Sequence, residues 1–137
     1  MARDIFHDAV RRALEKQNWT ITADPLGVKF GDINFQVDLA AERILAADRG
    51  DEKIAVEIKS FLSPSAITDF YAALGQFLSY RLALSNAEPE RTLYLAVPLD
   101  TYESFFQLAF PHAAIEQYQL KLAVYDSAEE VITTWIS

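Results

Sequence analysis

The amino-acid sequence predicts an α/β fold in which a mixed central β-sheet is flanked by helices. Three observations support this fold class: an amphipathic helical pattern opens the chain, short extended segments follow it, and a long apolar helical pattern precedes another buried strand. The order reads α-β-β-β-α-β, followed by a mixed C-terminal part. Because the chain has 137 residues, no repeat and no Pro/Gly/Ser-rich linker, we expect one domain over residues 1–137.

The N-terminal part is expected to form one helix and several extended segments. Residues 3–17 place apolar side chains at helical spacing, with basic and acidic side chains on the other side. Turn signals at Asp24-Pro25 and Gly31-Asp32 separate the segments that follow. These segments are residues 19–23, 28–30 and 33–39, the last prolonged by residues 43–47.

A strand and a long helix are the strongest predictions for the middle of the chain. After a turn at residues 49–51, residues 53–61 alternate, with Ile54, Val56 and Ile58 on the face that should pack on the core. The helix is expected to begin at Ser63-Pro64-Ser65 and to run over residues 66–84. Its predicted apolar stripe consists of Ile67, Phe70, Tyr71, Leu74, Phe77, Leu78 and Leu82.

The C-terminal part begins with a buried strand over residues 91–97 and a helix over residues 101–109. Residues 119–125 and 131–136 then read either as a hairpin or as a strand followed by a short helix.

Composition excludes several functional classes. The chain has no cysteine, so it forms neither disulfides nor a Cys-based zinc site. His7 and His112 are too few and too far apart for a His-rich metal site, and His7 is interpreted as a packing or surface residue. The sequence has neither a membrane-length apolar run nor a signal-peptide pattern, so we expect a cytoplasmic protein. The net charge of −8 argues against unaided tight DNA binding.

One group of polar residues stands out on the predicted strands. Period-2 alternation places Glu57 and Lys59 side by side, on the face opposite Ile54. In the upstream segment, Asp38 shares a face with Gln36 and meets Glu57 if the two strands pair. A carboxylate and an ammonium in an apolar strand are costly unless they are paired, solvated or bound to a metal.

Two convergent carboxylates suit a hard cation such as Mg²⁺, and a lysine beside it can orient or deprotonate the attacking water or stabilise charge on a scissile phosphate. These residues therefore indicate metal-assisted phosphodiester hydrolysis. The alternative is that Glu57 and Lys59 are surface charges of an edge strand and that Asp38 is one of many solvated acids.

An Asp followed by a hairpin and then E-x-K on the next strand resembles the PD-(D/E)xK nuclease superfamily. Within it, three stretches closely resemble the XisH family, named for the fdxN element excision controlling factor. They are DLAAERILAADRG (38–50), KIAVEIKSF (53–61) and ALGQFLSY (73–80). The resemblance covers most of the chain and implies a restriction-endonuclease-like α-β-β-β-α-β core.

The resemblance also implies roles for individual residues. Asp38 and Glu57 match the metal ligands, for Mg²⁺ or Mn²⁺, and Lys59 matches the catalytic lysine. Asp8 lies on the first helix, where many members carry a Glu that helps to hold the metal; it reads equally well as an acid at a helix start. The proline that often precedes the motif aspartate is replaced by Val37.

Gln76 and Tyr80 lie four residues apart, on one face of the long helix. Their spacing resembles a Q-x-x-x-Y motif that borders the active site in RecB-like members, where it is proposed to orient the metal shell or the DNA backbone. The alternative is a local hydrogen bond for Gln76 and a core position for Tyr80.

Two functions follow from the resemblance. One is a Mg²⁺-dependent DNA endonuclease that acts during excision of a DNA element. The other is a non-catalytic accessory factor for a site-specific recombinase, working with a small partner protein of the XisI type. A homodimer would place two sites on one duplex, with a contact from the aromatic residues of the C-terminal third. Those residues are Phe105, Phe106, Phe110, Tyr118, Tyr125 and Trp135.

Overall fold

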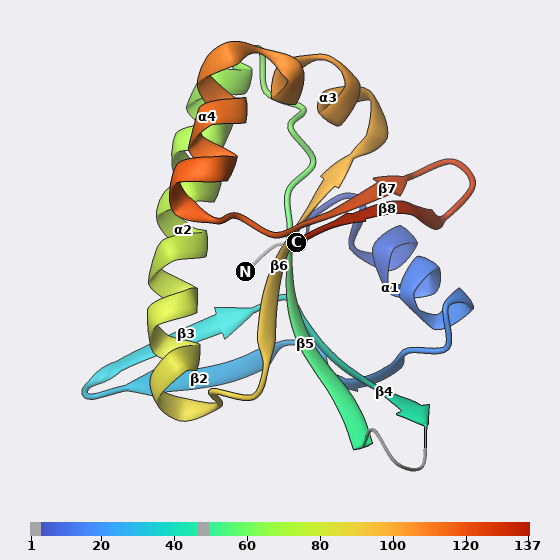
Figure 1. Ribbon diagram of the computed structural model, residues 1–137, viewed down its shortest axis with the longest axis vertical. Helices are drawn as coiled ribbons and strands as arrows, with labels where there is room; N and C mark the ends of the chain where they lie inside the picture. Colours follow the sequence, from blue (N-terminus) through green and yellow to red (C-terminus); the bar gives the residue numbers. More distant parts are fainter. Residues whose placement is uncertain (1–3, 47–49) are drawn as a thin grey trace.

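The computed structural model describes residues 4–46 and 50–137. A six-stranded mixed sheet forms its centre, with α2 and α4 on one face and α1 on the other (Figure 1). The predicted α/β class is therefore confirmed. In sheet order, the strands are β1 (Thr20–Ala23), β4 (Leu39–Ala46), β5 (Gly50–Ile58), β6 (Thr92–Pro98), β7 (Leu122–Asp126) and β8 (Val131–Ile136).

The strand directions place two parallel pairs at the centre of this sheet. β5 pairs with β6 and β6 with β7 in parallel, whereas the outer pairs β1–β4, β4–β5 and β7–β8 are antiparallel. The order α1-β1-β4-β5-α2-β6 matches the predicted α-β-β-β-α-β core. The hairpin of β2 (Leu26–Phe30) and β3 (Ile33–Val37) is inserted between β1 and β4, forms its own two-stranded sheet and lies beside α2.

The predicted continuous strand through residue 39 is wrong, because the chain bends at Asp38. Val37 pairs with Leu26 in the hairpin, whereas Leu39 pairs with Val56 of β5. At the bend, the Asp38 side chain accepts a hydrogen bond from a backbone N–H and therefore takes the place of a regular strand-to-strand bond. β4 does extend to Ala46, but residue 47 of the predicted extension lies outside the described residues, as does residue 49 of the predicted turn.

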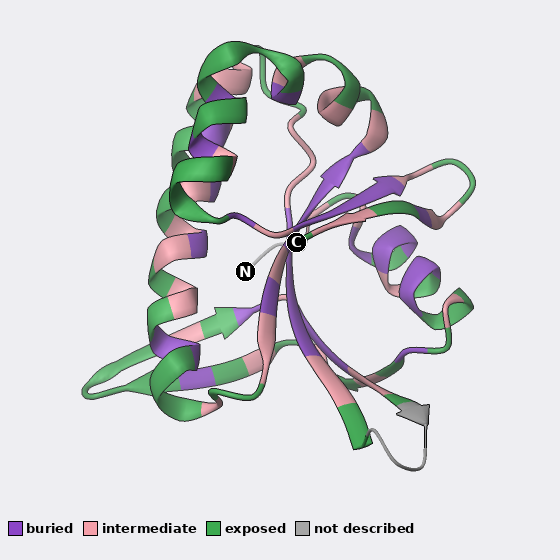
Figure 2. Ribbon diagram, in the orientation of Figure 1, coloured by how far each residue is buried: buried purple, intermediate pink, exposed green. Residues whose placement is uncertain are grey.

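Both faces of β5 are buried near its C-terminal end (Figure 2). Ile54, Val56 and Ile58 pack with the apolar side of α1 (His7–Lys16), as predicted. Ala55 and Glu57 on the other face are buried as well, because α2 (Ala66–Ala87) covers that side. Glu57 is therefore a carboxylate of a central strand, so the alternative of a surface charge on an edge strand does not hold for it.

The first helix begins later than predicted. The Phe6 N–H donates to Asp4 Oδ1 at 2.9 Å and the His7 N–H donates to the Asp4 carbonyl at 3.0 Å, so residues 4–6 form a turn that precedes α1. Residue 3 of the predicted helix lies outside the described residues.

The long helix α2 starts where the sequence indicates. Ser65 is its N-cap, and the Ser65 side chain accepts a hydrogen bond from the Thr68 N–H at 3.3 Å. Its predicted apolar stripe is only partly buried: Phe70 and Phe77 lie in the core, whereas Tyr71 and Leu82 are exposed. None of the described helices combines the length and the apolar character needed to cross a bilayer.

The predicted helix over residues 101–109 is wrong, because three short elements replace it. They are α3 (Leu99–Glu103), a 3₁₀ turn (Phe105–Gln107) and α4 (Ala109–Tyr118). The Ser104 hydroxyl donates to the Asp100 carbonyl at 2.7 Å, and the non-helical backbone angles of Ser104 end α3. For the tail, the structure selects the hairpin, formed by β7 and β8.

Candidate functional site

A cavity of about 570 Å³ opens beside the C-terminal end of β5. It brings together five of the six predicted site residues, and α1, the β1–β2 corner, the bend after β3 and α2 all contribute to its wall. Its lining consists of Asp4, His7, Asp24, Pro25, Gln36, Asp38, Glu57, Ile58, Lys59, Gln76 and Tyr80.

The carboxylates of Asp38 and Glu57 each accept a hydrogen bond from a backbone N–H at the opposite segment. The Asp38 N–H donates to Glu57 Oε1 at 3.2 Å, and the Ile58 N–H donates to Asp38 Oδ2 at 2.8 Å. The pairing of Leu39 with Val56 sets this reciprocal arrangement, because it places the bend beside the end of β5. The two carboxylates therefore converge in a preorganised geometry, as the sequence predicts.

The environment of Glu57 strongly disfavours a negative charge. The residue is only 6% exposed. Burial first, and the neighbouring Asp38 carboxylate second, raise the pKa of Glu57 to about 8, although the Lys59 charge and the Asp38 N–H act in the opposite direction. At neutral pH this carboxyl group mostly keeps its proton, and a cation placed beside it would favour its ionised form.

Lys59 is the first residue beyond β5. Its N–H donates to the Ala96 carbonyl of β6 at 3.0 Å, and its Nζ lies 4.0 Å from Glu57 Oε2. The strand predicted to reach residue 61 ends at Ile58, and Phe61, whose backbone is left-handed at φ 54°, then turns the chain. Lys59 nevertheless stays on the same side as Glu57, as the alternation predicts.

Gln76 and Tyr80 reach the cavity from successive turns of α2. Gln76 Oε1 is buried and has no hydrogen-bond partner among the described residues. Burial, and then the charges of Glu57 and Asp38, raise the pKa of Tyr80 to about 12, so its hydroxyl stays protonated. Tyr80 also contacts Phe35 of β3 edge-on, with ring centres 6.0 Å apart, and therefore combines a packing position with a place in the cavity.

Asp8, the sixth predicted site residue, does not line this cavity. It is exposed on α1, and its charge helps to raise the pKa of the Arg12 guanidinium. Asp4 and His7 supply the polar groups that α1 and the preceding turn bring to the cavity.

A buried polar cluster that no sequence pattern predicts lies where α1 meets the cavity. His7 is 3% exposed, and its Nε2 lies 2.8 Å from Asp24 Oδ1. Arg11 Nη1 donates to the other oxygen of Asp24 at 2.6 Å. The helical spacing of His7 to Val10 and Leu14 signals that His7 is buried. Its pairing with Asp24, 17 residues away, has no local signal.

The donor set fits magnesium better than a metal that needs a complete protein cage. In the described ranges, no three His, Asp or Glu side chains converge as a metal cluster. Asp38 and Glu57 offer two carboxylates, and Mg²⁺ typically uses one or two carboxylates while keeping several waters. The unpartnered Oε1 of Gln76 is an acceptor suited to such a water.

The whole chain has close relatives in sequence and structure. The model of the family described as "XisH protein" matches residues 1–133. An XisH family protein from Nostoc punctiforme PCC 73102 is 53% identical, covering 98% of this chain and 100% of that one, with a TM-score of 0.89. An fdxN element excision controlling factor protein from Anabaena variabilis has the same identity and coverage, with a TM-score of 0.90. No curated protein matches. This chain therefore belongs to the XisH family.

Proposed function

We propose that this protein is a divalent-cation-dependent DNA endonuclease that acts in the excision of a DNA element. The observation that carries the proposal is the convergence of Asp38, Glu57 and Lys59 in one cavity, with the Glu57 carboxylate bound by the Asp38 N–H and the Asp38 carboxylate by the Ile58 N–H. The similar protein from Anabaena variabilis is an excision controlling factor, and excision requires that DNA strands be broken. Hydrolysis at this site would supply that step.

Each residue has a chemical task in this proposal. Asp38 and Glu57 would hold Mg²⁺ or Mn²⁺, and Glu57 would give up its proton when the ion binds. The bound ion would supply Lewis-acid activation of the phosphate and of a water molecule. Lys59 would orient the attacking water or stabilise the charge that develops on the phosphate. Gln76 would accept a hydrogen bond from a metal-bound water, and Tyr80 would donate one to the DNA backbone.

Cleavage assays with matched variants test the proposal. Supercoiled plasmid and linear duplex DNA are incubated with the protein and Mg²⁺ or Mn²⁺. Lys59→Ala is expected to lower the cleavage rate by at least ~100-fold while Mg²⁺ affinity persists, and Glu57→Ala is expected to lose both. Asp51→Asn, at the exposed start of β5 and outside the cavity, is the control and should cleave normally. Wild-type protein that binds neither ion and cuts neither substrate would exclude the endonuclease.

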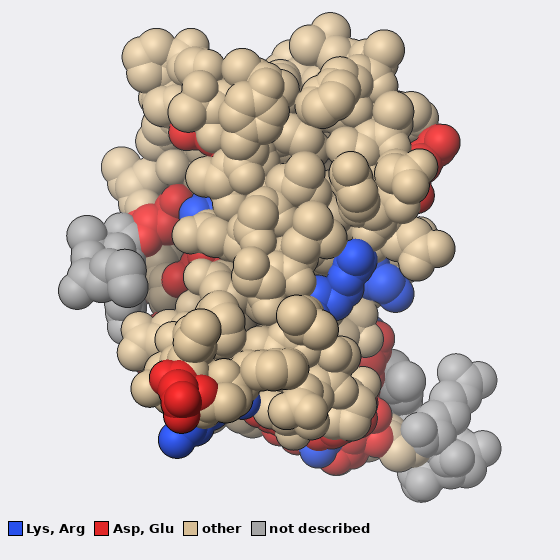
Figure 3. All heavy atoms as spheres, turned by 90° about the vertical axis from the view of Figure 1, so that its left-hand side faces the viewer, with Lys and Arg blue, Asp and Glu red and all other residues tan. Residues whose placement is uncertain are grey.

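The acidic charge favours a second candidate, a non-catalytic accessory factor for a recombinase that works with a small XisI-type partner. The net charge is −8, and the face over α2 and α4 carries few basic side chains (Figure 3). Duplex binding relies on Lys and Arg at phosphates, so a partner would have to supply basic surface. Full excision in cells that carry Lys59→Ala, together with co-purification of such a partner, would favour this function over catalysis.

We also propose a homodimer formed through the α2–α4 face. Tyr71, Leu82, Phe110 and Tyr118 are exposed there, whereas Phe106 and Tyr125 of the predicted aromatic contact are buried. A second copy is the occupant that the charge favours, because two chains of charge −8 repel each other least through their least charged surface, and this face is largely uncharged (Figure 3). The same apolar side chains would then lie on both sides of the contact.

A further inference from the structure

The hydrogen-bond ladder between β5 and β6 is interrupted next to Lys59. The Ala96 carbonyl accepts from the Lys59 N–H, whereas the Leu95 N–H donates to the carbonyl of Lys121, the residue just before β7, so the even-numbered residues of β6 face β5. In a parallel pair, a residue whose N–H donates to one carbonyl of the partner strand accepts, at its own carbonyl, from the N–H two residues further along that strand. For the Lys59 carbonyl, this donor would be the N–H of residue 98. Residue 98 is proline and has no N–H. The ladder therefore leaves the Lys59 carbonyl without its regular partner.

The hydroxyl of Tyr125 takes the place of that missing donor. It donates to the Lys59 carbonyl at 3.0 Å, reaching across from β7, where Tyr125 lies opposite Pro98. Tyr125 is only 1% exposed, and burial raises its pKa far above the ordinary tyrosine value, so the hydroxyl remains a donor at any working pH. Phe6 braces the tyrosine ring edge-on, with ring centres 5.9 Å apart and an interplanar angle of 68°.

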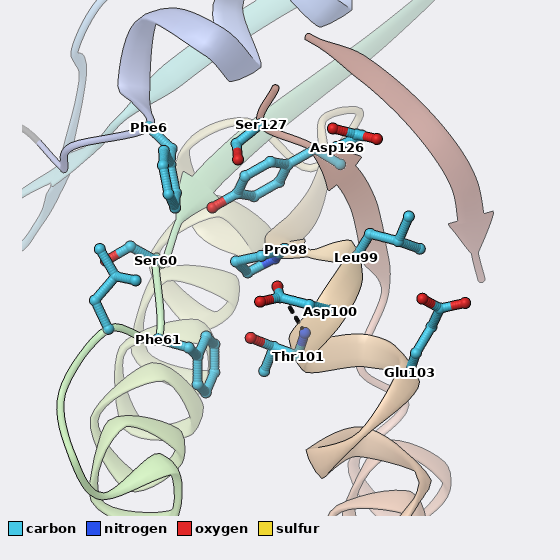
Figure 4. Close-up of a pocket in the computed structure, with 12 residues that line it drawn as sticks. Phe6, Ser60, Phe61, Pro98, Leu99, Asp100, Thr101, Glu103, Asp126 and Ser127 are labelled. Carbon is cyan, nitrogen blue, oxygen red and sulfur yellow. Dashed lines mark hydrogen bonds between the residues drawn. The ribbon is translucent and has the colours of Figure 1, made fainter. Parts of the chain in front are cut away.

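Beyond Lys59 the chain leaves the sheet. Residues 59–64 belong to no helix or strand. Ser60, Phe61 and Leu62 instead border a pocket of about 260 Å³, with Phe6, Pro98 and Asp100 among its other walls (Figure 4). The Lys59 peptide is thus held by two bonds from two different strands, the Lys59 N–H to β6 and the Lys59 carbonyl to the Tyr125 side chain.

We infer that Tyr125 is a positioning residue, which fixes the backbone of Lys59 and thereby the direction of its ammonium group in the cavity. The inference rests on the proposed function, in which that ammonium acts on the phosphate or on the attacking water. Tyr125 itself acts only through Lys59, because its hydroxyl is bound to the lysine carbonyl. A displacement of about 1 Å at a reacting group can lower a rate by up to ~100-fold, so one backbone hydrogen bond at this residue affects turnover.

Tyr125→Phe tests the inference, because it removes the hydroxyl and keeps the ring. It is expected to lower kcat roughly ten-fold, with KM for DNA and Mg²⁺ affinity unchanged, since only the lysine loses its position. Amide hydrogen exchange at residues 59–61 should accelerate. Tyr94→Phe is the matched control: it removes a hydroxyl from the neighbouring strand β6 whose hydrogen-bond partner, Ser137 at 3.3 Å, lies away from Lys59.

A rescue variant separates positioning from general damage. Adding Pro98→Ala to Tyr125→Phe restores an N–H at the ladder position facing Lys59, so kcat and amide protection should recover at least in part. Wild-type kcat and wild-type exchange at residues 59–61 in Tyr125→Phe would overturn the inference. If wild-type protein cuts no DNA, the proposed function fails, and the exchange rates with and without Pro98→Ala still decide whether Tyr125 holds Lys59.

Discussion

At the scale of single residues, Glu57 is the most informative side chain. It is a nearly buried carboxyl group on a central strand, it faces a second carboxylate, and its pKa is raised to about 8. A structural role alone would be served better by an apolar residue at this position, because burying an ionisable group without a full partner is costly. The lysine 4.0 Å away compensates only partly. A cation between the two carboxylates would supply the positive charge that the lysine provides only in part.

The raised pKa of Glu57 makes the stability of the folded protein depend on pH. Glu57 has a raised pKa in the folded state, about 8 against an ordinary value of 4.5, so the folded chain keeps a proton that the unfolded chain loses. Its contribution to the free energy of unfolding is therefore greatest below pH ~4.5 and declines up to pH ~8. Denaturation of wild type and Glu57→Gln without metal should show this decline in wild type only. Parallel pH profiles would contradict the raised pKa.

The same proton links pH to metal affinity. Below pH ~8, Mg²⁺ must displace one proton from Glu57, so its affinity should rise by up to ten-fold per pH unit and then level off. Calorimetry in buffers of different ionisation enthalpy should detect about one proton released per ion below that pH. Asp51→Asn, at the exposed start of β5 and outside the cavity, serves as the control and should titrate as wild type does.

At the scale of elements, the bend between β3 and β4 brings the first carboxylate to the second. Asp38 accepts the Ile58 N–H, so its side chain is both a structural acceptor and a proposed ligand. Two substitutions of Asp38 can distinguish these two roles. Asp38→Ala leaves the Ile58 N–H without its acceptor and should cost about 1–3 kcal/mol of unfolding free energy.

Asp38→Asn is the matched variant, because its amide oxygen can still accept the Ile58 N–H. It should lose Mg²⁺ affinity and yet keep most of the stability that Asp38→Ala loses. Denaturant titration and calorimetry on the two variants measure both quantities. Equal destabilisation by both variants would show that the charge, and not the hydrogen bond, holds the bend.

The strand bearing Glu57 was predictable because its alternation is local. The alternation indicates one buried face, formed by Ile54, Val56 and Ile58, and places the polar E-x-K residues on the other face. The bend at Asp38 was not predictable, because the hydrogen bonds that cause it come from β5, about 20 residues away. The break at Ser104 likewise depends on a serine hydroxyl that competes for a backbone carbonyl.

The proposed catalytic residues were predictable from their sequence neighbourhood, but their supports were not. The Tyr125–Lys59 bond spans 66 residues and depends on where Pro98 falls in the register of a parallel pair. The pairing of His7 with Asp24 depends on how α1 packs against the corner after β1. Such contacts exist only once the tertiary structure has formed, and no local pattern encodes them.

At the scale of the whole molecule, charge and apolar surface are unevenly distributed. The chain carries a net charge of −8, yet the face over α2 and α4 is largely uncharged (Figure 3). Leu82 of α2 and Phe110 of α4 are both exposed. Exposed apolar side chains that gather on one face commonly mark an interaction surface. This distribution underlies the proposed homodimer.

Light scattering on surface variants tests the homodimer. Wild type at micromolar concentration is expected to have twice the chain mass of 15.4 kDa, and Leu82→Glu should shift the equilibrium towards monomer, because it buries a charge in the contact. Ile44→Glu is the control, since Ile44 is 75% exposed on β4 and lies outside the α2–α4 face. A wild-type mass of one chain at this concentration would remove the dimer.

The bend at Asp38 has a mechanical consequence as well. One proposed ligand stands where the β2–β3 hairpin joins the central sheet, and the other stands on the central sheet itself. An ion bound by both ligands would therefore link the hairpin sheet to the central sheet. Binding of the ion would then also fix the position of the β2–β3 hairpin relative to the central sheet.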